Sequence, residues 1–472
     1  AQAIPGAFTI EKKDRAPCSE ACPAHINVQG YVQMVKEGKY REAVEIIMRD
    51  LPFPGVLGRI CTHRCEKSCR RLEVDEAISI MELKRVAADH VDLSEIPVRE
   101  IEPREEKVAI IGSGPAGLTA AYFLALDGYK VSVYEAMPEP GGMMRYGIPA
   151  HRLPRHVLDA EIENLKRYGI DIYPNTAIGK DITLEELQSH GAKAIFIATG
   201  AWKGLKLNIP GEDHPGVEHV THFLQEVHTG RREKLEGKVV GFGVGHSAMD
   251  ATRVAFRLGA DSVTVVDPFS VAEMPADPEE KKEVEEEGAK IHFQVVPKRF
   301  VIENEKVVGV ECLRTRLTEP DTTGRRKFIP IQDSEFFIEG DFVIPAVGQE
   351  PDLDFLGEDH EGLEVSRWNF LVVNPETLQT NRAGIFGGGD VITGSATVIE
   401  AVEAGKRVAK YMAKYLRGEE LPTEWQEDVP MGDNWVQIPE DTPLKKRLEI
   451  PTLPKEKRLL GFQEVKLEVD EK

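Results

Sequence analysis

Apolar residues along this chain recur with two different spacings, and the change between them divides the chain into regions. Between residues 20 and 90 they recur every three or four positions, which predicts helices over 28–36, 40–49 and 78–90. From residue 107 onward, short apolar runs alternate with helical patterns. Such alternation is typical of parallel β-sheets whose strands are joined by helices. The sequence therefore predicts a small helical region followed by an α/β part.

Two strand–turn–helix–strand units stand out within the α/β part. The first has apolar strands at 107–111 and 130–134, with a helix at 116–126 between them. The second unit repeats this order, with strands at 238–242 and 262–266 around a helical pattern. Because a glycine-rich turn follows the first strand of both units, we expect two nucleotide-binding domains.

The segments after the second unit indicate how the two domains are joined. A charged helix at 278–288 and hairpin-like strands at 298–311 and 327–337 extend the second unit. The strand at 341–347 and the glycine-rich run at 385–390 resemble the strand and glycine pattern of the first unit. We therefore expect one nucleotide domain to be inserted within the other.

The expected fold class is α/β, with two Rossmann-type three-layer domains after a small helical domain. We place the helical module and its linker at 1–105, and the first nucleotide domain at 106–215 together with 345–415. The second nucleotide domain takes 216–344. The remaining residues, 416–472, are rich in Pro, Glu and Lys without strong periodicity, which predicts an extended arm on the body or on a neighbour.

Composition and charge exclude several classes of partner. The chain has 472 residues, of which 41% are hydrophobic, and a formal net charge of −21. A strongly acidic chain repels phosphate backbones and anionic lipids, so we expect no nucleic-acid partner. There is no apolar run of membrane-spanning length and no apolar signal stretch in the first residues. We expect a cytoplasmic protein without a membrane span.

The glycine turn of the first unit follows a strand directly and opens a helix, as a dinucleotide-binding turn does. Its first glycine permits a tight turn, its second lets a pyrophosphate approach, and its third lets the helix pack on the strand. An acid that ends the next strand is placed to accept hydrogen bonds from a ribose. The cofactor-binding residues expected here are Gly112, Gly114, Pro115, Ala116, Gly117 and Glu135.

The second unit repeats the turn in the form GxGxxA, which ends at Ala248. An acid closing the following strand would hold a ribose 2′-hydroxyl, whereas an arginine there would hold a 2′-phosphate. The alternative is that this acid merely caps the loop before Pro268. The nucleotide-binding residues expected here are Gly243, Gly245, His246, Ser247 and Asp267.

Five of the six cysteines lie in the first 69 residues, as Cys18-xxx-Cys22-Pro and Cys61-xxx-Cys65-xxx-Cys69. This clustering favours metal ligation over disulfides in a chain expected to be cytoplasmic. Short spacings let one loop supply several thiolates to an iron–sulfur cluster, and zinc is the alternative metal. We expect these five cysteines to be metal ligands that hold together a helical module with little core of its own.

With these motifs in view, the chain resembles the small (β) subunit of glutamate synthase and its relatives over about residues 18–415. The relatives include the large subunit of NADH-dependent ferredoxin:NADP oxidoreductase and the flavin half of dihydropyrimidine dehydrogenase. Besides the turns and cysteines, the shared motifs are Gly141-Gly-Met-Met-Arg-Tyr-Gly-Ile-Pro149, Ala198-Thr-Gly200, Ala248-Met-Asp250, Glu273-Met-Pro-Ala276, Ala346-Val-Gly-Gln349 and Gly388-Gly-Asp390-Val-Ile-Thr-Gly394.

The resemblance implies that the first nucleotide domain holds FAD and that the second holds NAD(P)H beside the flavin. It also implies that a hydride passes to the flavin and that electrons leave singly, through a cluster, to a partner subunit of a larger complex. Because the flavin performs the chemistry, we expect no catalytic acid, base or nucleophile from the protein. The further cofactor-binding residues implied are Gly142, Arg145, Gly147, Ile148, Thr199, Gly200, Gly389, Asp390 and Thr397.

The cysteines depart from the family pattern. The cysteine pair that relatives carry upstream is absent, and five thiolates cannot fill two four-cysteine clusters, so we expect one 4Fe-4S cluster. The family register places Cys22, Cys61 and Cys65 on it, with a non-cysteine fourth ligand. That position falls near Lys84, which makes Glu82 a neighbouring candidate. The other two cysteines are then fourth ligands or remnants of a second cluster.

Two further departures concern the donor and the tail. The arginines that usually follow the second strand of the nicotinamide domain are replaced by 267–269, Asp-Pro-Phe. We therefore expect NADH to be preferred and NADPH to be the poorer donor. Many relatives continue into a cysteine-rich ferredoxin segment, whereas this sequence ends in the polar residues 465–472.

The leading functional hypothesis is an electron-input subunit that oxidises NADH, or reduces NAD, for a protein acceptor or donor. A thioredoxin-reductase-like dithiol enzyme is excluded, because neither nucleotide domain has a CxxC pair and Cys312 stands alone. A non-catalytic flavoprotein scaffold with a vestigial dinucleotide site is the alternative. Val244 keeps it open, since relatives often have glycine there.

Overall fold

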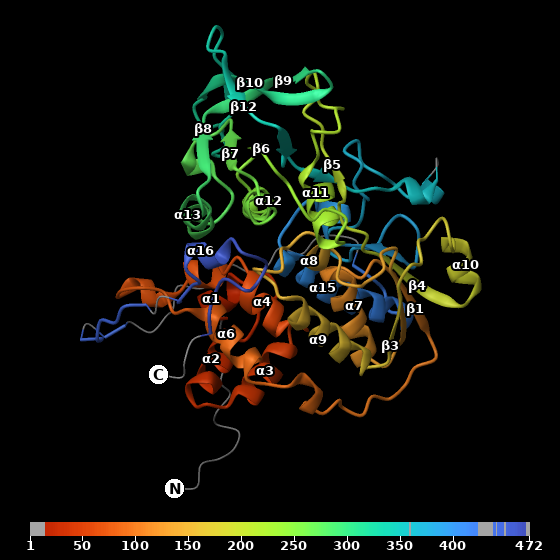
Figure 1. Ribbon diagram of the computed structural model, residues 1–472. Coiled ribbons are helices and arrows are strands. Elements are labelled where there is room, and N and C mark those ends of the chain that lie inside the picture. Colours follow the sequence, from red (N-terminus) through yellow and green to blue (C-terminus); the bar gives the residue numbers. More distant parts are fainter. Residues whose placement is uncertain (1–14, 358–359, 423–437, 440, 448–449, 469–472) are drawn as a thin grey trace.

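The computed structural model describes residues 15–357, 360–422, 438–439, 441–447 and 450–468 (Figure 1). In chain order these residues form a helical module, a first α/β unit, a second α/β unit and a C-terminal segment that returns to the body. Within these ranges, no helix combines the length and the apolar character that crossing a bilayer requires.

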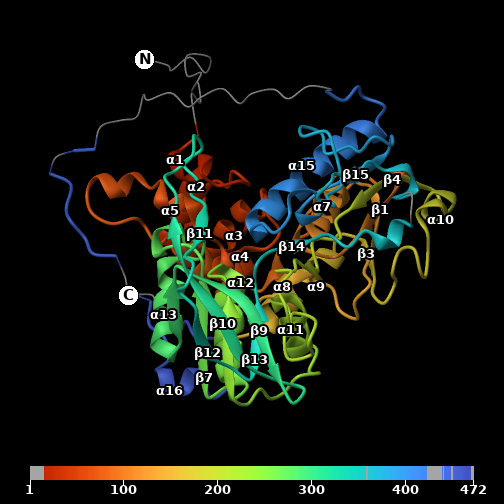
Figure 2. The same ribbon diagram turned by 90° about the horizontal axis from the view of Figure 1, so that it is seen from above.

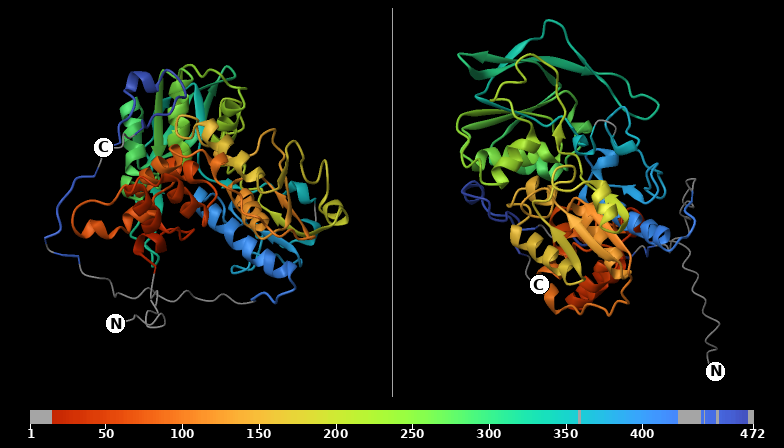
Figure 3. Two further views of the ribbon diagram at one scale, coloured as in Figure 1. Left: turned by 90° about the horizontal axis from the view of Figure 1, so that it is seen from below. Right: turned by 90° about the vertical axis from the view of Figure 1, so that its right-hand side faces the viewer.

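The helical module confirms the helices predicted from the spacing of apolar residues and adds shorter ones. Its buried side chains include Tyr31, Leu51 and Phe53, each fully enclosed. The expectation of little core was therefore wrong, because short helices from separate parts of the sequence bury their apolar faces together. Figure 3 shows the module lying against the first unit. The elements are α1 (Pro17–Glu20), α2 (Val28–Lys36), α3 (Tyr40–Met48), α4 (Pro54–Ile60), α5 (Arg64–Lys67), η1 (Arg70–Glu73), α6 (Ile80–Asp89) and η2 (Leu93–Glu95).

The first unit is a parallel sheet with the strand order β15-β4-β1-β2-β3. Its strands are β1 (Lys107–Ile111), β2 (Lys130–Tyr134), β3 (Ile170–Tyr173), β4 (Ala192–Ile197) and β15 (Ile385–Gly387). The helices are α7 (Pro115–Leu126), α8 (Met143–Tyr146), α9 (Arg155–Lys166), α10 (Leu184–Ser189), α14 (Asp390–Thr393) and α15 (Val398–Leu416). Figure 2 shows α15 beside α7. A Cβ on Gly405 would lie 2.4 Å from the carbonyl oxygen of Ala116, so this close helix pairing requires a glycine.

The second unit has a parallel sheet with the order β13-β6-β7-β8 and an antiparallel sheet beside it. The strand predicted at 341–347 belongs to this sheet as β13, and not to the first unit. A strand that is buried on both faces is uniformly apolar in either parallel sheet, so amino-acid composition could not show to which sheet this strand belongs. The parallel strands are β6 (Lys238–Phe242), β7 (Ser262–Asp267), β8 (Lys290–Phe293) and β13 (Phe342–Pro345). The antiparallel strands are β9 (Val295–Glu303), β10 (Lys306–Leu317), β11 (Phe328–Pro330) and β12 (Phe336–Glu339), and the helical elements are α11 (Val220–His228), α12 (His246–Arg257), η3 (Val271–Glu273) and α13 (Pro278–Glu287).

The chain crosses between the units on two short strands, β5 (Lys203–Gly204) and β14 (Gln349–Glu350), which pair antiparallel. Since β15 follows the second unit in sequence but joins the first sheet, the second unit is an insertion in the first. The predicted fold class is confirmed. Two short turns, η4 (Asp354–Leu356) and η5 (His360–Gly362), precede β15.

The described part of the C-terminal arm lies on the body. The backbone N–H of Val465 donates to the carbonyl of His151 at 3.0 Å. Glu464 forms an ion pair with Arg59 at 2.8 Å, so the arm reaches the helical module as well. One short helix, α16 (Lys455–Arg458), interrupts it. The part of the predicted arm at 423–437 lies outside the described residues.

Candidate functional site

The first glycine turn, which joins β1 to α7, is tight at its first and third glycines and open at its second. Gly112 has a φ of 100°, and a Cβ there would lie 2.5 Å from the carbonyl oxygen of Ala198. A Cβ on Gly117 would lie 2.0 Å from the carbonyl oxygen of Gly112. Around Gly114, by contrast, no atom of the described chain lies within 4 Å of an added Cβ. This open space at the N-terminus of α7 fits the approach of a pyrophosphate.

Glu135 ends β2 beside this turn and is 5% exposed. Its carboxylate accepts hydrogen bonds from the backbone N–H of Ser113 at 3.0 Å and from that of Met137 at 2.8 Å. Glu135 therefore fixes the turn and stands at the edge where a ribose is expected. Pro115 opens α7 and needs no backbone partner there, while Ala116 is buried under α15.

The segment 141–149 folds over the first turn. Gly142 has a φ of 52°, and a Cβ there would lie 2.7 Å from the Cα of Gly114. Arg145 is 6% exposed and donates to the carbonyl of Pro140 at 2.6 Å, and it also pairs with Asp159. Because Arg145 has local partners, its contact with a cofactor phosphate stays a prediction.

The remaining residues implied for the flavin lie at the ends of β4 and β15, on the edge where the first turn lies. Thr199 follows β4, before Gly200, and its Oγ1 is buried without a hydrogen-bond partner among the described residues. Gly389 precedes α14, and burial raises the pKa of Asp390 to about 7. Thr397 caps α15. An orphaned hydroxyl and a buried carboxyl beside an open glycine turn fit a polar cofactor such as FAD.

The second glycine turn has the same geometry as the first. Gly243 has a φ of 98°, and a Cβ there would lie 2.5 Å from the carbonyl oxygen of Ala346. No described atom lies within 4 Å of a Cβ added to Gly245, so this turn is also open at its second glycine. Val244, which kept the scaffold hypothesis open, turns its side chain into the core of the second unit and is 2% exposed. The larger residue therefore leaves the binding face of the turn clear.

Asp267 ends β7 next to the second turn and is 7% exposed. Its Oδ1 accepts a hydrogen bond from the backbone N–H of Phe269 at 2.8 Å. Burial raises the pKa of Asp267, and hydrogen bonds from the backbone at Phe269 and Val244 offset part of that rise. Asp267 thus caps its own loop and also occupies the strand end where a ribose is expected.

A cleft of about 840 Å³ is lined by parts of the predicted sites. It is lined by 61–63 from the helical module, by 147–148 from the segment over the first turn, and by 245–247 from the second turn. Asp390 and Thr397 line it from the first unit. The cleft therefore joins segments predicted to hold the flavin, the nicotinamide dinucleotide and the cysteine-bound cluster.

Charged side chains cross this cleft and connect the two units. Arg152, just after the segment 141–149, forms ion pairs with Asp250 and Glu280 at 2.8 Å. Glu280 also contacts Nδ1 of His246 at 2.6 Å, and that hydrogen bond raises the pKa of His246. Sequence reasoning missed this network, because no local pattern pairs an arginine with an acid about a hundred residues away.

The five N-terminal cysteines form a set of three and a pair. Burial raises the pKa of Cys65 to about 12, with Lys84 opposing the rise and the neighbouring Cys61 and Cys22 adding to it. Burial likewise raises the pKa of Cys18, whose thiol neighbour is Cys69. This grouping is the one that the family register implies, with Lys84 beside the set of three. Glu82 lies near as a further candidate ligand: it is 5% exposed, and its Oε2 has no partner in the described chain.

The sulfur atoms are not gathered as closely as a single zinc ion would require. Among the described residues, no three cysteine sulfurs lie within 4.8 Å of one another. A zinc ion binds each thiolate at about 2.3 Å, which requires closely spaced sulfurs. The thiolates of a 4Fe-4S cluster bind different iron atoms and stand farther apart.

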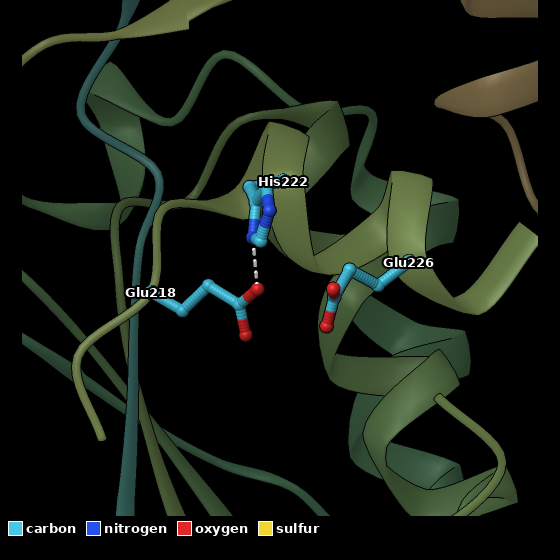
Figure 4. A group of neighbouring side chains, drawn as sticks. All are labelled: Glu218, His222 and Glu226. Atoms are coloured by element: carbon cyan, nitrogen blue, oxygen red, sulfur yellow. Dashed lines mark hydrogen bonds and ion pairs between the residues drawn. The ribbon is translucent and has the colours of Figure 1, made fainter. Parts of the chain in front are cut away.

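Glu218, His222 and Glu226 do bring three ligand atoms within 4.8 Å of one another (Figure 4). Arg232 already forms ion pairs with both glutamates, at 2.6 Å and 2.9 Å. The guanidinium balances the two carboxylates, so we read this group as a structural ion-pair network.

Comparisons with known proteins identify the family of each part of the chain. Residues 106–405 match the pyridine nucleotide-disulphide oxidoreductase family, and residues 10–96 match the 4Fe-4S domain II of dihydropyrimidine dehydrogenase. The chain is 40% identical over 462 residues to the β subunit of the NADPH-Fe(3+) oxidoreductase of Geobacter sulfurreducens, covering 90% of this chain and 68% of that protein. It is 41% identical over 455 residues to the β subunit of the NADP(+)-dependent formate dehydrogenase of Moorella thermoacetica, covering 89% and 63%. It is 32% identical over 421 residues to the small chain of the NADPH glutamate synthase of Azospirillum brasilense, covering 85% and 86%.

Solved structures support the fold. FprA of Mycobacterium tuberculosis in complex with NADPH has a TM-score of 0.58 at 17% identity, covering 67% of this chain and 85% of that chain. Thioredoxin reductase of Lactococcus lactis has a TM-score of 0.50 at 24% identity, covering 66% and 100%.

Proposed function

The chain belongs to the pyridine nucleotide-disulphide oxidoreductase family and carries an iron–sulfur domain, and from this premise we propose that it is the NADH-oxidising electron-input subunit of a larger complex. It is an oxidoreductase that uses FAD, a nicotinamide dinucleotide and a 4Fe-4S cluster. The observation that carries the proposal is the cleft where 61–63, 147–148 and 245–247 meet. In this cleft a dinucleotide on the second turn would face the flavin segments and the cysteine site.

In this proposal the chain's own residues bind and orient the cofactors. Bound FAD would supply hydride acceptance and one-electron release. The open glycines Gly114 and Gly245 would each admit a pyrophosphate, and Glu135 would hold a ribose of FAD. Cys22, Cys61 and Cys65 would ligate the cluster. Because two of the relatives named above are β subunits, we propose that electrons pass to or from a protein partner. The cytoplasmic location stays part of the proposal.

The preference for NADH rests on the surroundings of Asp267. A 2′-phosphate would bring further negative charge beside this buried carboxylate, whereas a 2′-hydroxyl could donate to it. Arg253 and Arg257 on α12 are cations that could offset this repulsion if they were free. Arg253 pairs with Glu287 at 2.7 Å, and Arg257 pairs with the same carboxylate at 2.8 Å. Both arginines are therefore engaged by Glu287 and not free to bind a 2′-phosphate. In this respect the proposal for this chain differs from the three relatives, whose names specify NADPH or NADP(+).

The test compares kcat/KM for flavin reduction by NADH and by NADPH in the parent and in Asp267→Ala. Like charges at a binding site cost several kcal/mol, so we expect roughly a tenfold to thousandfold preference for NADH that the substitution removes. Asp261→Ala, which removes an exposed acid just before β7, is the matched control and should leave the ratio unchanged. A parent that favours NADPH, or an Asp267→Ala variant with the parental ratio, would contradict the proposal.

A further inference from the structure

A second groove, of about 1600 Å³, lies away from the nucleotide cleft. Its walls come from the end of α3, the C-terminal half of α7 and the outer face of α15, and the linker after η2 closes one end. Figure 2 shows α15 and α7 next to the helical module that completes this groove. The nucleotide and flavin residues described above do not line it.

The groove is lined by residues next to the cysteine site. Residues 23–25, which directly follow Cys22, line the groove. The ammonium of Lys406, from α15, reaches in and donates to the carbonyl of Ala24 at 3.2 Å. Residues 61–63 line the nucleotide cleft. Cys61 therefore lines the nucleotide cleft itself, while the residues that directly follow Cys22 line the groove.

The groove contains cations without acidic partners. No carboxylate of the described chain forms an ion pair or hydrogen bond with Arg49, Arg99, Lys410 or Lys414. The ammonium groups of Lys410 and Lys414 instead lie over the ring of Tyr411, at 5.0 Å and 5.6 Å from its centroid. Arg49, Arg99 and Lys410 are exposed at the surface.

Most of the acids in the groove, by contrast, are already engaged. Asp50 pairs with Lys406 at 2.6 Å, and Glu403 pairs with Arg407 at 3.1 Å. Glu376 accepts a hydrogen bond from the hydroxyl of Tyr411. Eight Arg and Lys side chains and six Asp and Glu side chains line the groove, so it carries a small excess of positive charge on a chain whose net charge is −21. A local positive field on an acidic protein selects an acidic partner and speeds its approach.

We propose that this groove docks an acidic electron-transfer protein, which exchanges electrons with the cluster at Cys22, Cys61 and Cys65. The inference rests on the proposed function and adds the partner's chemistry and its place. Each encounter reduces the partner's oxidised centre by one electron that originates in NADH. Two encounters therefore consume one NADH and yield one NAD⁺, one proton and two reduced partner molecules.

The test measures the binding of a purified acidic bacterial ferredoxin, as the probe, to the cofactor-loaded protein at low and high salt. Lys410→Glu combined with Lys414→Glu reverses two groove cations that belong to no cofactor site. Lys180→Glu combined with Lys193→Glu makes the same charge change on exposed residues outside the groove and is the matched control. We expect the groove pair to raise the dissociation constant at least tenfold at low salt and to flatten its salt dependence. The control should stay within about twofold of the parent.

A second readout separates this inference from the proposed function. Reduction of menadione, a small neutral acceptor, by NADH should be unchanged in both double variants. Three binding results would overturn the inference: equal weakening by the two pairs, no binding to the parent at low salt, or binding only after residues 423–437 are replaced by a neutral linker. The last result would mean that this chain itself fills the groove. Failure of the parent to reduce menadione would instead contradict the proposed function.

Discussion

The first unit and the helical module share one apolar core, whereas the second unit has cores of its own. The shared core runs from Ile47 and Phe53 of the module to Leu118 of α7 and Val402 of α15. The second unit packs around separate clusters. Contacts across to it include the Arg152 network and weaker pairs such as Lys67 with Asp277 at 3.8 Å.

This difference fits the two kinds of ligand. FAD and a cluster that pass electrons repeatedly must keep a fixed separation, and a continuous close-packed core provides it. A dinucleotide must enter and leave, which a unit held by polar contacts permits more readily. The comparison therefore predicts that changes in the shared core disturb bound cofactors and stability together, while changes at the polar junction have small effects.

Gly117→Val tests the shared core most severely. The new side chain would start 2.0 Å from the carbonyl oxygen of Gly112, so α7 must move off β1. We expect a loss on the order of 4 kcal/mol in the free energy of unfolding, together with loss of FAD. Urea unfolding and flavin content measure both. Gly114→Ala, whose methyl meets no described atom, should lower FAD content without changing the stability of the apoprotein.

Cys61→Ser and Cys65→Ser should each remove most of the bound iron. Because the apolar core that the module shares with the first unit holds the module's helices, we expect these helices and the bound flavin to remain in both variants. Elemental analysis and far-ultraviolet circular dichroism check the two expectations. Cys312→Ser, at a buried cysteine of the second unit, is the control and should keep its iron. Full iron in both cluster variants, or zinc in place of iron in the parent, would contradict the ligand assignment.

Glu161 joins the module to the first unit from α9. Its carboxylate accepts hydrogen bonds from the backbone N–H groups of Gly55 and Val56 at the start of α4. Glu161→Ala leaves both donors buried without a partner, so we expect a loss of roughly 2–3 kcal/mol in the free energy of unfolding. Val157→Ala, a neighbour on α9, controls for loss of packing alone. A change below about 0.5 kcal/mol in the free energy of unfolding of Glu161→Ala would contradict the view that the module and the first unit are tightly joined.

The same residue predicts a pH dependence. Burial raises the pKa of Glu161 to about 8, although the two backbone N–H groups lower it in part. A carboxyl whose folded pKa lies above its unfolded value of about 4.3 stabilises the fold fully below that value. This contribution is lost as the pH rises through about 8. Thermal unfolding should show a decline from pH 5 to pH 8.5 that is shallower in Glu161→Gln.

Lys67→Ala tests the polar junction and should have the smallest effect. Its ion pair with Asp277 is exposed on the lysine side. We therefore expect the free energy of unfolding to fall by at most about 1 kcal/mol at low salt and not at all at high salt. Chemical unfolding at two ionic strengths measures this. A loss of stability as large as that of Glu161→Ala would show that the second unit is held to the body as strongly as the helical module is held to the first unit.

The sequence predicted the local elements well because their signals are local. The strands β1 and β6 are mainly apolar runs that end at glycine turns, and both turns have the expected open second glycine. The features it missed depend on distant residues. The module's core joins four helices, β13 could not be assigned to a sheet by composition, and the groove cations come from 49, 99, 410 and 414.

An anaerobic titration of the cofactor-loaded protein with NADH tests the central claim, that one cleft joins the dinucleotide, the flavin and the cysteine site. We predict that stoichiometric NADH bleaches the flavin absorbance and that the electron paramagnetic resonance signal of a reduced iron–sulfur cluster appears in the same titration. A flavin that neither NADH nor NADPH bleaches would favour the scaffold alternative. A flavin that bleaches while the cluster stays oxidised would contradict the claim that the cleft connects them.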